Sequence, residues 1–340
     1  MSEMQRDARI LVVGPSWIGD TVMSQCLFKA LKGRDPDIAI DVLAPPGMGP
    51  VLSRMPEVDA VLPSPFGHRN FHLAKRIGVG RTLVGRYAAA YVLPGSWKSA
   101  IIPYVARVPR RIGYLREARW GLLNDIRPLP SAIKRKTAIA YQALAEPEVA
   151  ADRSRLAVPA LRVDMDNRDH LLGIDGLSEG AFAAFFPGAE YGPAKRWPAR
   201  HWSALAGRLD RLGLRVVLFG SPKDRDFGQE IVTAQSSILD LTGRTSIKDA
   251  IDLISAARFA VTNDSGLMHV AAAVGRKLVA IYGSTSPNDT PALSDATAFL
   301  SLGLPCSPCF KRTCPLGHFD CLEKLEPAMA MRAIETLGAI

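Results

Sequence analysis

The fold is decided first by residues 9–21, which read Arg9-Ile10-Leu11-Val12-Val13-Gly14-Pro15-Ser16-Trp17-Ile18-Gly19-Asp20-Thr21. The run Ile10–Val13 is continuously apolar and is closed by glycine and proline, which is typical of a buried parallel strand. A helix is expected to follow over about residues 18–32. Further short apolar runs, at 38–43, 60–62 and 89–93, alternate with helix-length segments such as 98–107. This alternation predicts a doubly wound α/β sheet.

The same rhythm restarts in the second half of the chain, after a stretch of weaker periodicity at about residues 146–180. Strands are predicted at 183–186, 214–219, 259–262 and 278–282, with helices near 200–212, 222–234, 247–257 and 266–274. A chain of 340 residues is also too long for one ordinary domain. We therefore expect two Rossmann-like domains, 1–165 and 166–322, and a final helical segment, 323–340, that packs back across the lobes.

Composition restricts the classes of protein that the chain can represent. Hydrophobic residues make up 48% and charged residues 22%, as in ordinary globular proteins. The polar start and the short first apolar run predict neither a signal peptide nor a membrane span, so a cytoplasmic location is expected. The net charge of +9 indicates an acidic partner, which could be nucleic acid, anionic lipid or a phosphorylated small molecule.

The loop after the first strand has the glycine spacing of a phosphate-binding P-loop, but Asp20 stands where that motif has lysine. A carboxylate there would repel phosphate. Gly14 and Gly19 also do not form the G-x-G pair of a dinucleotide-binding fingerprint. Asp20 is instead an acid at a helix start, where the helix dipole favours its ionised form. Such a carboxylate suits a general base, or it only caps the helix.

Two loops of the second domain carry residues suited to binding a diphosphate. The loop at 186–198 is rich in glycine and proline and ends in Lys195 and Arg196, so it can bring backbone N–H groups and a cation to phosphates. An ordinary solvated turn with a surface lysine is the alternative. The second loop, Thr262-Asn263-Asp264-Ser265-Gly266, follows a strand and enters a helix with Asp264 or Ser265 as its N-cap. Its first turn predicts an anion site, with His269 about one turn further along.

Four of the five cysteines fall close together in the sequence, at Cys306, Cys309, Cys314 and Cys321. Disulfides are not expected in a reducing compartment, so the thiols are either buried or ligate a structural zinc ion or an iron–sulfur cluster. Basic residues of the first domain, namely His68, Arg69, Lys98, Arg110, Arg111 and 134–136, could meet an anionic acceptor. Any one of them by itself is more typical of ordinary surface charge.

Four long motifs, at 14–20, 52–58, 187–198 and 262–273, closely resemble the type II branch of the ADP-heptose:lipopolysaccharide heptosyltransferase family. The resemblance spans nearly the whole chain and keeps the order and spacing of the motifs. It implies a GT-B type glycosyltransferase, with two Rossmann-like lobes facing a central cleft. The first lobe would bind the acceptor and the second the ADP-sugar, with no cofactor required for the chemistry.

The resemblance also implies the reaction and the residues that perform it. The family transfers L-glycero-D-manno-heptose from ADP-heptose to the first heptose of the inner core on Kdo-modified lipid A, with inversion. Asp20 aligns with the general base and Lys195 with a lysine that contacts the diphosphate. The other positions expected to contact substrate are Gly19, Gly188, Ala189, Glu190, Asp224 (a candidate for the ribose hydroxyls), Asp264, Ser265, Gly266 and His269. Work on a lipid-linked acceptor implies a place at the inner face of the inner membrane.

Two other functions compete with this one. The sister activity, which adds the first heptose to Kdo, differs only in its acceptor. A basic nucleic-acid-binding protein with a four-cysteine metal site would also carry positive charge. Such a protein should interleave basic and aromatic residues on one face, whereas aromatic residues are only 7% of this chain and the charges are scattered. Nucleic acid is therefore not an expected partner.

Overall fold

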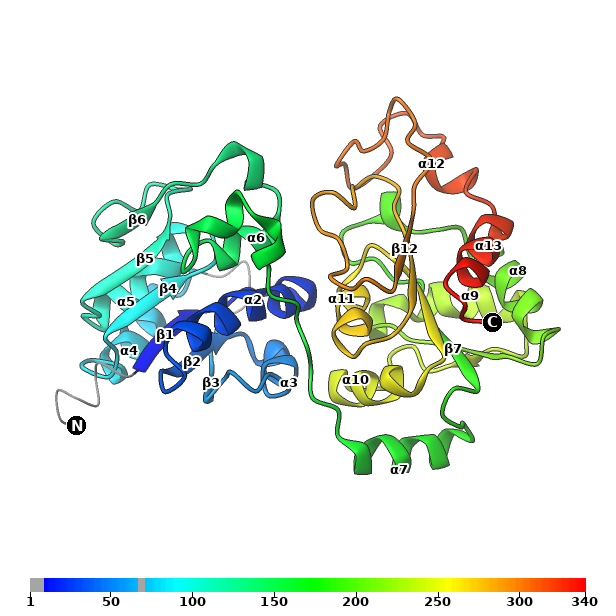
Figure 1. The fold of residues 1–340 in the computed structure, drawn as a ribbon, viewed down its shortest axis with the longest axis horizontal. Helices are drawn as coiled ribbons and strands as arrows, with labels where there is room; N and C mark the ends of the chain where they lie inside the picture. Colours follow the sequence, from blue (N-terminus) through cyan, green and yellow to red (C-terminus); the bar gives the residue numbers. More distant parts are fainter. Residues whose placement is uncertain (1–8, 67–70) are drawn as a thin grey trace. The chain divides into compact units, whose positions relative to one another are not determined.

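The computed structural model describes residues 9–66 and 71–340. The chain divides into two compact units, Met1–Pro159 and Ala160–Ile340. Each unit contains one six-stranded parallel sheet accompanied by helices (Figure 1), which confirms the predicted α/β class. No helix among residues 9–66 and 71–340 is long and apolar enough to cross a membrane.

The first unit orders its strands β3-β2-β1-β4-β5-β6, with β1 in a central position. The strands are β1 (Arg9–Val13), β2 (Ala39–Ala44), β3 (Ala60–Pro63), β4 (Ala89–Val92), β5 (Arg110–Tyr114) and β6 (Asp125–Arg127). The helices are α2 (Ile18–Arg34), α3 (Gly49–Leu52), α4 (Leu73–Thr82), α5 (Ile101–Val105) and α6 (Thr137–Gln142). Residue 10 of β1 pairs with residues 40 and 89 of its two neighbours, so the predicted first strand is confirmed as the centre of the sheet.

The second unit repeats this plan with the strand order β12-β11-β10-β7-β8-β9. The strands are β7 (Phe182–Phe186), β8 (Arg215–Leu218), β9 (Leu239–Asp240), β10 (Phe259–Asn263), β11 (Leu278–Ile281) and β12 (Thr297–Leu300). The helices are α7 (Met165–Asp175), α8 (Ala199–Asp210), α9 (Arg225–Ala234), α10 (Ile247–Ala256), α11 (Gly266–Ala273), α12 (Asp320–Glu323) and α13 (Pro327–Thr336). In both sheets the carboxyl ends of neighbouring strands lie at one edge, where ligands bind in open α/β sheets.

The core of the second unit depends on α8. Its buried residues Trp202, Leu205, Ala206 and Leu209 recur at helical spacing and pack with residues of β7, β8 and β10. Burying one such leucine contributes about 1.5–3 kcal/mol. The aromatic rings of Phe185 and Trp202 lie 5.2 Å apart. This packing places the chain just before α8, including Lys195, at the carboxyl edge of the sheet.

The boundary between the units differs from the predicted one at 165/166. Residues just before α7 already bond to the second unit, since the Leu161 amide donates to Ala273 O at 2.9 Å. The Asp164 amide donates to the buried Asp252 carboxylate, also at 2.9 Å. Sequence periodicity is weak here because α7 buries little of its surface. The second unit therefore begins at residue 160.

The expected separate segment 323–340 is part of the second unit. Helix α13 packs beside α8 (Figure 1), and Leu325, Ala330 and Ile334 lie fully buried in the same core cluster. The Trp197 indole donates to Leu325 O at 2.7 Å. The segment belongs to the second unit because the apolar face of α13 completes the core beside α8, β11 and β12.

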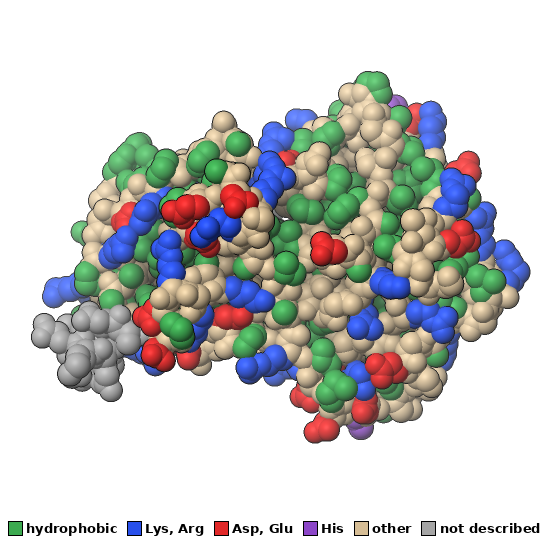
Figure 2. All heavy atoms as spheres, in the orientation of Figure 1, with side chains coloured by type: hydrophobic (Ala, Val, Ile, Leu, Met, Phe, Trp, Pro, Cys, Tyr) green, Lys and Arg blue, Asp and Glu red, His purple; other side chains and the backbone are tan. Residues whose placement is uncertain are grey.

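Surface charge follows the scattered pattern seen in the sequence. On the face shown in Figure 2, Lys and Arg side chains are interspersed with acidic and apolar side chains. Continuous single-sign stripes with interleaved aromatic rings are the usual footprint of nucleic-acid binding. The visible face does not show that footprint.

Candidate functional site

The turn between β10 and α11 is the first candidate site in the second unit. β10 ends at Asn263, and α11 begins at Gly266 with Ser265 in the N-cap position. The Ser265 backbone is extended, but its side chain makes no capping hydrogen bond. Because no N-cap side chain occupies the helix start, the N–H groups of the first turn can serve an anion. The predicted strand–turn–helix is confirmed, and Ser265 rather than Asp264 holds the N-cap position.

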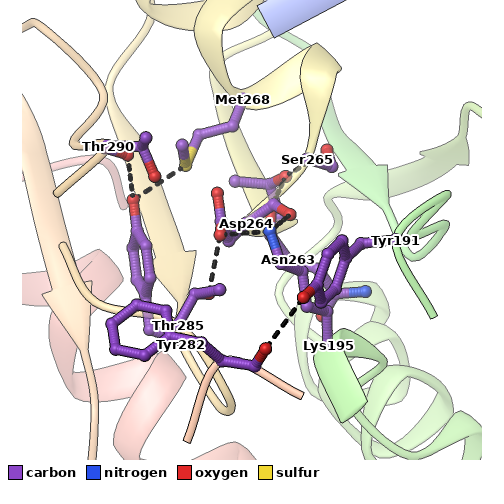
Figure 3. A network of polar contacts seen from close by, with 11 residues as sticks. Tyr191, Lys195, Asn263, Asp264, Ser265, Met268, Tyr282, Thr285 and Thr290 are labelled. Atoms are coloured by element: carbon purple, nitrogen blue, oxygen red, sulfur yellow. Dashed lines mark hydrogen bonds and ion pairs between the residues drawn. The ribbon is translucent and has the colours of Figure 1, made fainter. Parts of the chain in front are cut away.

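The Asp264 carboxylate holds Lys195 in this turn. Its Oδ2 accepts from Lys195 Nζ at 2.5 Å and from Thr285 Oγ1 at 2.6 Å (Figure 3). The two charged side chains are largely buried, with exposed fractions of 14% for Lys195 and 6% for Asp264. Lys195 Nζ also lies 5.0 Å from the centre of the Tyr191 ring, a cation–π distance. The lysine is therefore fixed beside the start of α11, and an anion bound there would share it with Asp264.

Asn263 ties the glycine- and proline-rich loop to the end of β10. Its side chain is fully buried; Oδ1 accepts from the Trp197 amide at 3.1 Å, and Nδ2 donates to Pro187 O at 2.6 Å. Both ends of the loop 187–197 are thus bonded to one amide group. Losing one partner would leave a buried polar group unsatisfied, at a cost of about 1–3 kcal/mol.

The remaining predicted donor-side residues play different parts. Asp224 is buried, and its Oδ2 accepts from the Ser221 amide at 3.0 Å in a capping box at the start of the 222–224 turn. Its Oδ1 lies 3.4 Å from Arg196. A Cβ at Gly188 would lie only 2.7 Å from the Asp224 carboxylate, so only glycine fits there without movement. These contacts give Asp224 a structural role, and its ribose contact stays a prediction.

Glu190 and Ala189 differ in their access to a ligand. Glu190 pairs with Lys223 at 2.5 Å, and both side chains are exposed. Ala189 is 3% exposed, so any contact with substrate would come from its backbone. Surface ion pairs contribute about 0–1 kcal/mol, so the Glu190 pair can open at little cost.

His269 lies in the second turn of α11 and is buried, with 5% of its surface exposed. Burial lowers the pKa of its imidazole to about 4; the nearby Asp264 opposes this shift and Lys195 adds to it. The side chain is therefore neutral at physiological pH. It cannot bind phosphate as a cation, and any contact with donor would be a neutral hydrogen bond.

The buried neutral state of His269 predicts a pH-dependent stability. The unfolded imidazole titrates near pH 6.5 and the folded one near pH 4, so the unfolded chain binds more protons between these values. The unfolding free energy should therefore fall by roughly 2–3 kcal/mol as the pH falls from 6.5 to 4. In urea unfolding at several pH values, His269→Gln should flatten this part of the curve. Replacing the exposed His170 by Gln should leave the slope unchanged; equal slopes in all three proteins would contradict the assignment.

The cysteine-containing segment braces the loop that carries Lys195. Tyr191 Oη donates to Phe310 O at 2.8 Å, and the Ala194 amide donates to Arg312 O at 3.0 Å. Gly192 has a φ of 151°, and a Cβ there would lie 2.6 Å from Arg312 O. The two segments therefore approach so closely that a side chain at residue 192 would separate them.

The four clustered cysteines are partly buried free thiols. Burial, together with the nearby Cys306, Cys309 and Cys314, raises the pKa of the Cys321 thiol to about 11. The pKa of Cys314 is lowered, first by the backbone N–H of Phe319 and also by those of residues 316–318. Across residues 9–66 and 71–340, no three His, Cys, Asp or Glu side chains are arranged to hold a metal ion. A structural zinc or iron–sulfur site stays a prediction.

These pKa differences predict the order of thiol alkylation in chelator-treated protein. With iodoacetamide at pH 8, Cys314 should react before Cys321, because the thiolate is the nucleophile. Cys26, buried in α2 with its pKa raised to about 12 by burial, should react only on unfolding. Peptide mass spectrometry would measure the order. In protein not treated with chelator, joint protection of the four clustered thiols and about one metal ion per chain would support the metal site, whereas unchanged reactivity would contradict it.

The first unit contains a pocket at the carboxyl edge of its sheet, with a volume of about 530 Å³. The loops after β1, β4 and β5 line it, as do residues of α2 and α6. Trp17 holds the N-cap position of α2 without a capping side-chain bond, and Asp20 lies in the first turn. Both residues line the pocket. The predicted acid at a helix start is thus confirmed as a pocket residue, whereas its role as a base stays a prediction.

Tyr141 of α6 shares the pocket with Asp20. Burial raises the pKa of this phenol well above its usual value, and the Asp20 carboxylate raises it further. The phenol therefore stays protonated and can act only as a neutral hydrogen-bonding group at physiological pH. No sequence pattern pointed to Tyr141, because a tyrosine at that helical position also fits a core.

Part of the predicted basic set lines this pocket. Lys98 and Lys134 do so, together with Arg116 and Arg119, which sequence reasoning did not single out. Arg110 instead pairs with Asp125 at 2.7 Å, outside the pocket. His68 and Arg69 lie outside the described residues.

Comparison with known proteins identifies the chain as a glycosyltransferase. A family model described as glycosyltransferase family 9 (heptosyltransferase) matches residues 76–320, and the chain belongs to that family.

The chain is similar to several relatives over nearly its whole length. It is 42% identical to lipopolysaccharide heptosyltransferase 2 of Escherichia coli K12, over 98% of each chain. It also matches the solved structure of E. coli ADP-heptose lps heptosyltransferase II, with a TM-score of 0.85 and 40% identity over 97% of this chain and 98% of that one. Lipopolysaccharide heptosyltransferase 1 of Pseudomonas aeruginosa is 28% identical, over 90% of this chain and 87% of the relative. The similarity favours the type 2 over the type 1 activity.

Proposed function

We propose that the chain transfers L-glycero-D-manno-heptose from ADP-heptose to the first heptose of the lipopolysaccharide inner core. The observation that carries this proposal is the 42% identity to a heptosyltransferase 2 over 98% of both chains. The acid-bearing pocket of the first unit and the cation-bearing turn of the second supply groups suited to such a transfer.

In the proposed reaction the acceptor hydroxyl oxygen attacks the anomeric carbon while the bond to the diphosphate oxygen breaks. Asp20 takes the hydroxyl proton, and ADP leaves with the bonding electron pair, so the configuration inverts. The charge that builds on the departing diphosphate is stabilised by Lys195 and by the N–H groups at the start of α11. No step forms a covalent enzyme intermediate.

Asp264 and Asn263 support this chemistry without touching the reacting atoms. Asp264 holds Lys195 in place, and Asn263 holds both ends of the loop that carries it. Preorganised charges stabilise a transition state without a cost of reorganisation at the moment of reaction. His269 stays neutral, so it keeps the total positive charge of the donor site low when no anion is bound.

The proposed location follows from the acceptor. A heptosyl-Kdo-lipid A acceptor is embedded in a membrane, so we place the enzyme at the cytoplasmic face of the inner membrane, bound peripherally. The net charge of +9 suits attraction to an anionic surface.

The transfer assay tests the function directly. With ADP-heptose, we expect product from an acceptor that bears the first heptose and none from an acceptor that ends in Kdo. Product only from the Kdo-terminated acceptor would assign the type 1 activity instead. Binding of nucleic acid that weakens with salt, without any heptose transfer, would support the nucleic-acid alternative.

Asp20→Asn tests the base. The amide cannot take a proton, so turnover should fall by about 10²- to 10⁴-fold, whereas ADP-heptose affinity should change little because the donor groups lie on the other unit. Isothermal titration and initial rates measure the two quantities. Replacing the exposed Asp37 by Asn gives a matched control that should keep full turnover. Unchanged turnover in Asp20→Asn would refute the base assignment.

A further inference from the structure

The pocket of the first unit carries more positive charge than a general base requires. Five cationic side chains and two carboxylates line it. The carboxylates are Asp20 and Glu117. Neutral sugar hydroxyls need hydrogen-bonding groups, not an excess of cations, so this lining indicates an anionic ligand group.

Arg119 is the clearest sign of that preference. Its side chain is 1% exposed, and within residues 9–66 and 71–340 its guanidinium donates to backbone carbonyls alone, those of Tyr114 and Pro94. No carboxylate of the described residues lies within ion-pair distance of the Arg119 guanidinium. Burial lowers the pKa of Arg119 to about 10, so the group remains charged at physiological pH. The Glu117 carboxylate favours the charged form of Arg119 from beyond ion-pair distance, but the five cations of the lining outnumber its two carboxylates and leave positive potential at the pocket wall.

Arg116 and Lys134 bring exposed cations to the same wall. The stem of Arg116 crosses Gly95 so closely that a Cβ at residue 95 would lie 2.7 Å from its Cδ. One of its terminal nitrogens donates to Lys134 O at 3.3 Å. Neither side chain forms an ion pair with a carboxylate in the described part of the chain. Their charged ends are thus available to a ligand, beside a pocket that also holds Asp20.

We propose that Arg116 and Lys134, backed by Arg119, form an anion subsite that binds the carboxylate of an acidic sugar in the acceptor. The inference rests on the proposed function, in which the reacting heptose is attached directly to Kdo, an ulosonic acid. The hydroxyl then meets Asp20 while the neighbouring carboxylate meets the cations. A guanidinium fork matches a carboxylate in two hydrogen bonds, and the pocket volume lies within the range of about 300–1,000 Å³ that is usual for ligand sites.

The experiment compares two soluble acceptors with ADP-heptose as donor: heptosyl-Kdo with a free carboxylate, and its methyl ester. In the unchanged protein, KM for the ester should be roughly 10- to 100-fold higher than KM for the acid, with a smaller effect on kcat. Arg116→Gln and Lys134→Gln should raise KM for the acid and change KM for the ester much less. Arg110→Gln, outside the pocket, is the matched control and should retain the full preference.

The outcomes separate this inference from the proposed function. If transfer occurs but the acid and the ester behave alike in all proteins, the subsite is refuted while the function stands. If a methyl ester that also carries a phosphate on the acceptor heptose has a low KM, the subsite binds phosphate, and the carboxylate assignment is overturned. If neither acceptor yields product, the proposed function fails first. Circular dichroism of the variants would show that these exposed substitutions leave the fold intact.

Discussion

The second unit depends on a single buried amide at the carboxyl end of β10. Asn263 bonds both ends of the loop 187–197, so the strand, the loop and the following turn form one rigid corner. Lys195 sits at that corner because the loop returns to the sheet there, and Asp264 then holds its charge. A buried polar group strongly favours the one arrangement in which it is fully hydrogen-bonded, because leaving it unsatisfied is costly. The position of the proposed diphosphate-binding lysine is therefore a consequence of one hydrogen-bonding side chain.

Electrostatic balance distinguishes the two units. In the second, Lys195 is paired with Asp264 and His269 is neutral, so these side chains carry little uncompensated charge. In the first, Arg119 is buried, and its partners among the described residues are backbone carbonyls. A paired site can release a charged product, because the protein partner replaces the ligand when it leaves. An unpaired cation favours retention of an anionic group, which suits the proposed role of the first unit in binding the acceptor.

The segment that carries the four cysteines supports the loop that contains Lys195, whether or not its thiols bind a metal. It contacts the Lys195 loop through Tyr191 and Ala194, and it requires glycine at residue 192. Cys306, Cys309 and Cys314 lie close enough to Cys321 to contribute to the rise in its pKa. The segment therefore helps to fix the geometry of the loop that carries Lys195.

The amino-acid sequence was enough to predict the two-sheet α/β architecture, because buried parallel strands and amphipathic helices have local periodicities that can be recognised without knowing their neighbours in the fold. It also singled out Asp20, Lys195 and the 262–266 turn, whose residue types suit their positions at strand ends. Contacts between distant segments decided that Asp224 lies against Gly188 and Arg196, that Arg119 is buried without an ion pair to a carboxylate of the described residues, and that the last helix completes the second core. Those properties depend on which distant groups approach a side chain, and no local pattern encodes that approach.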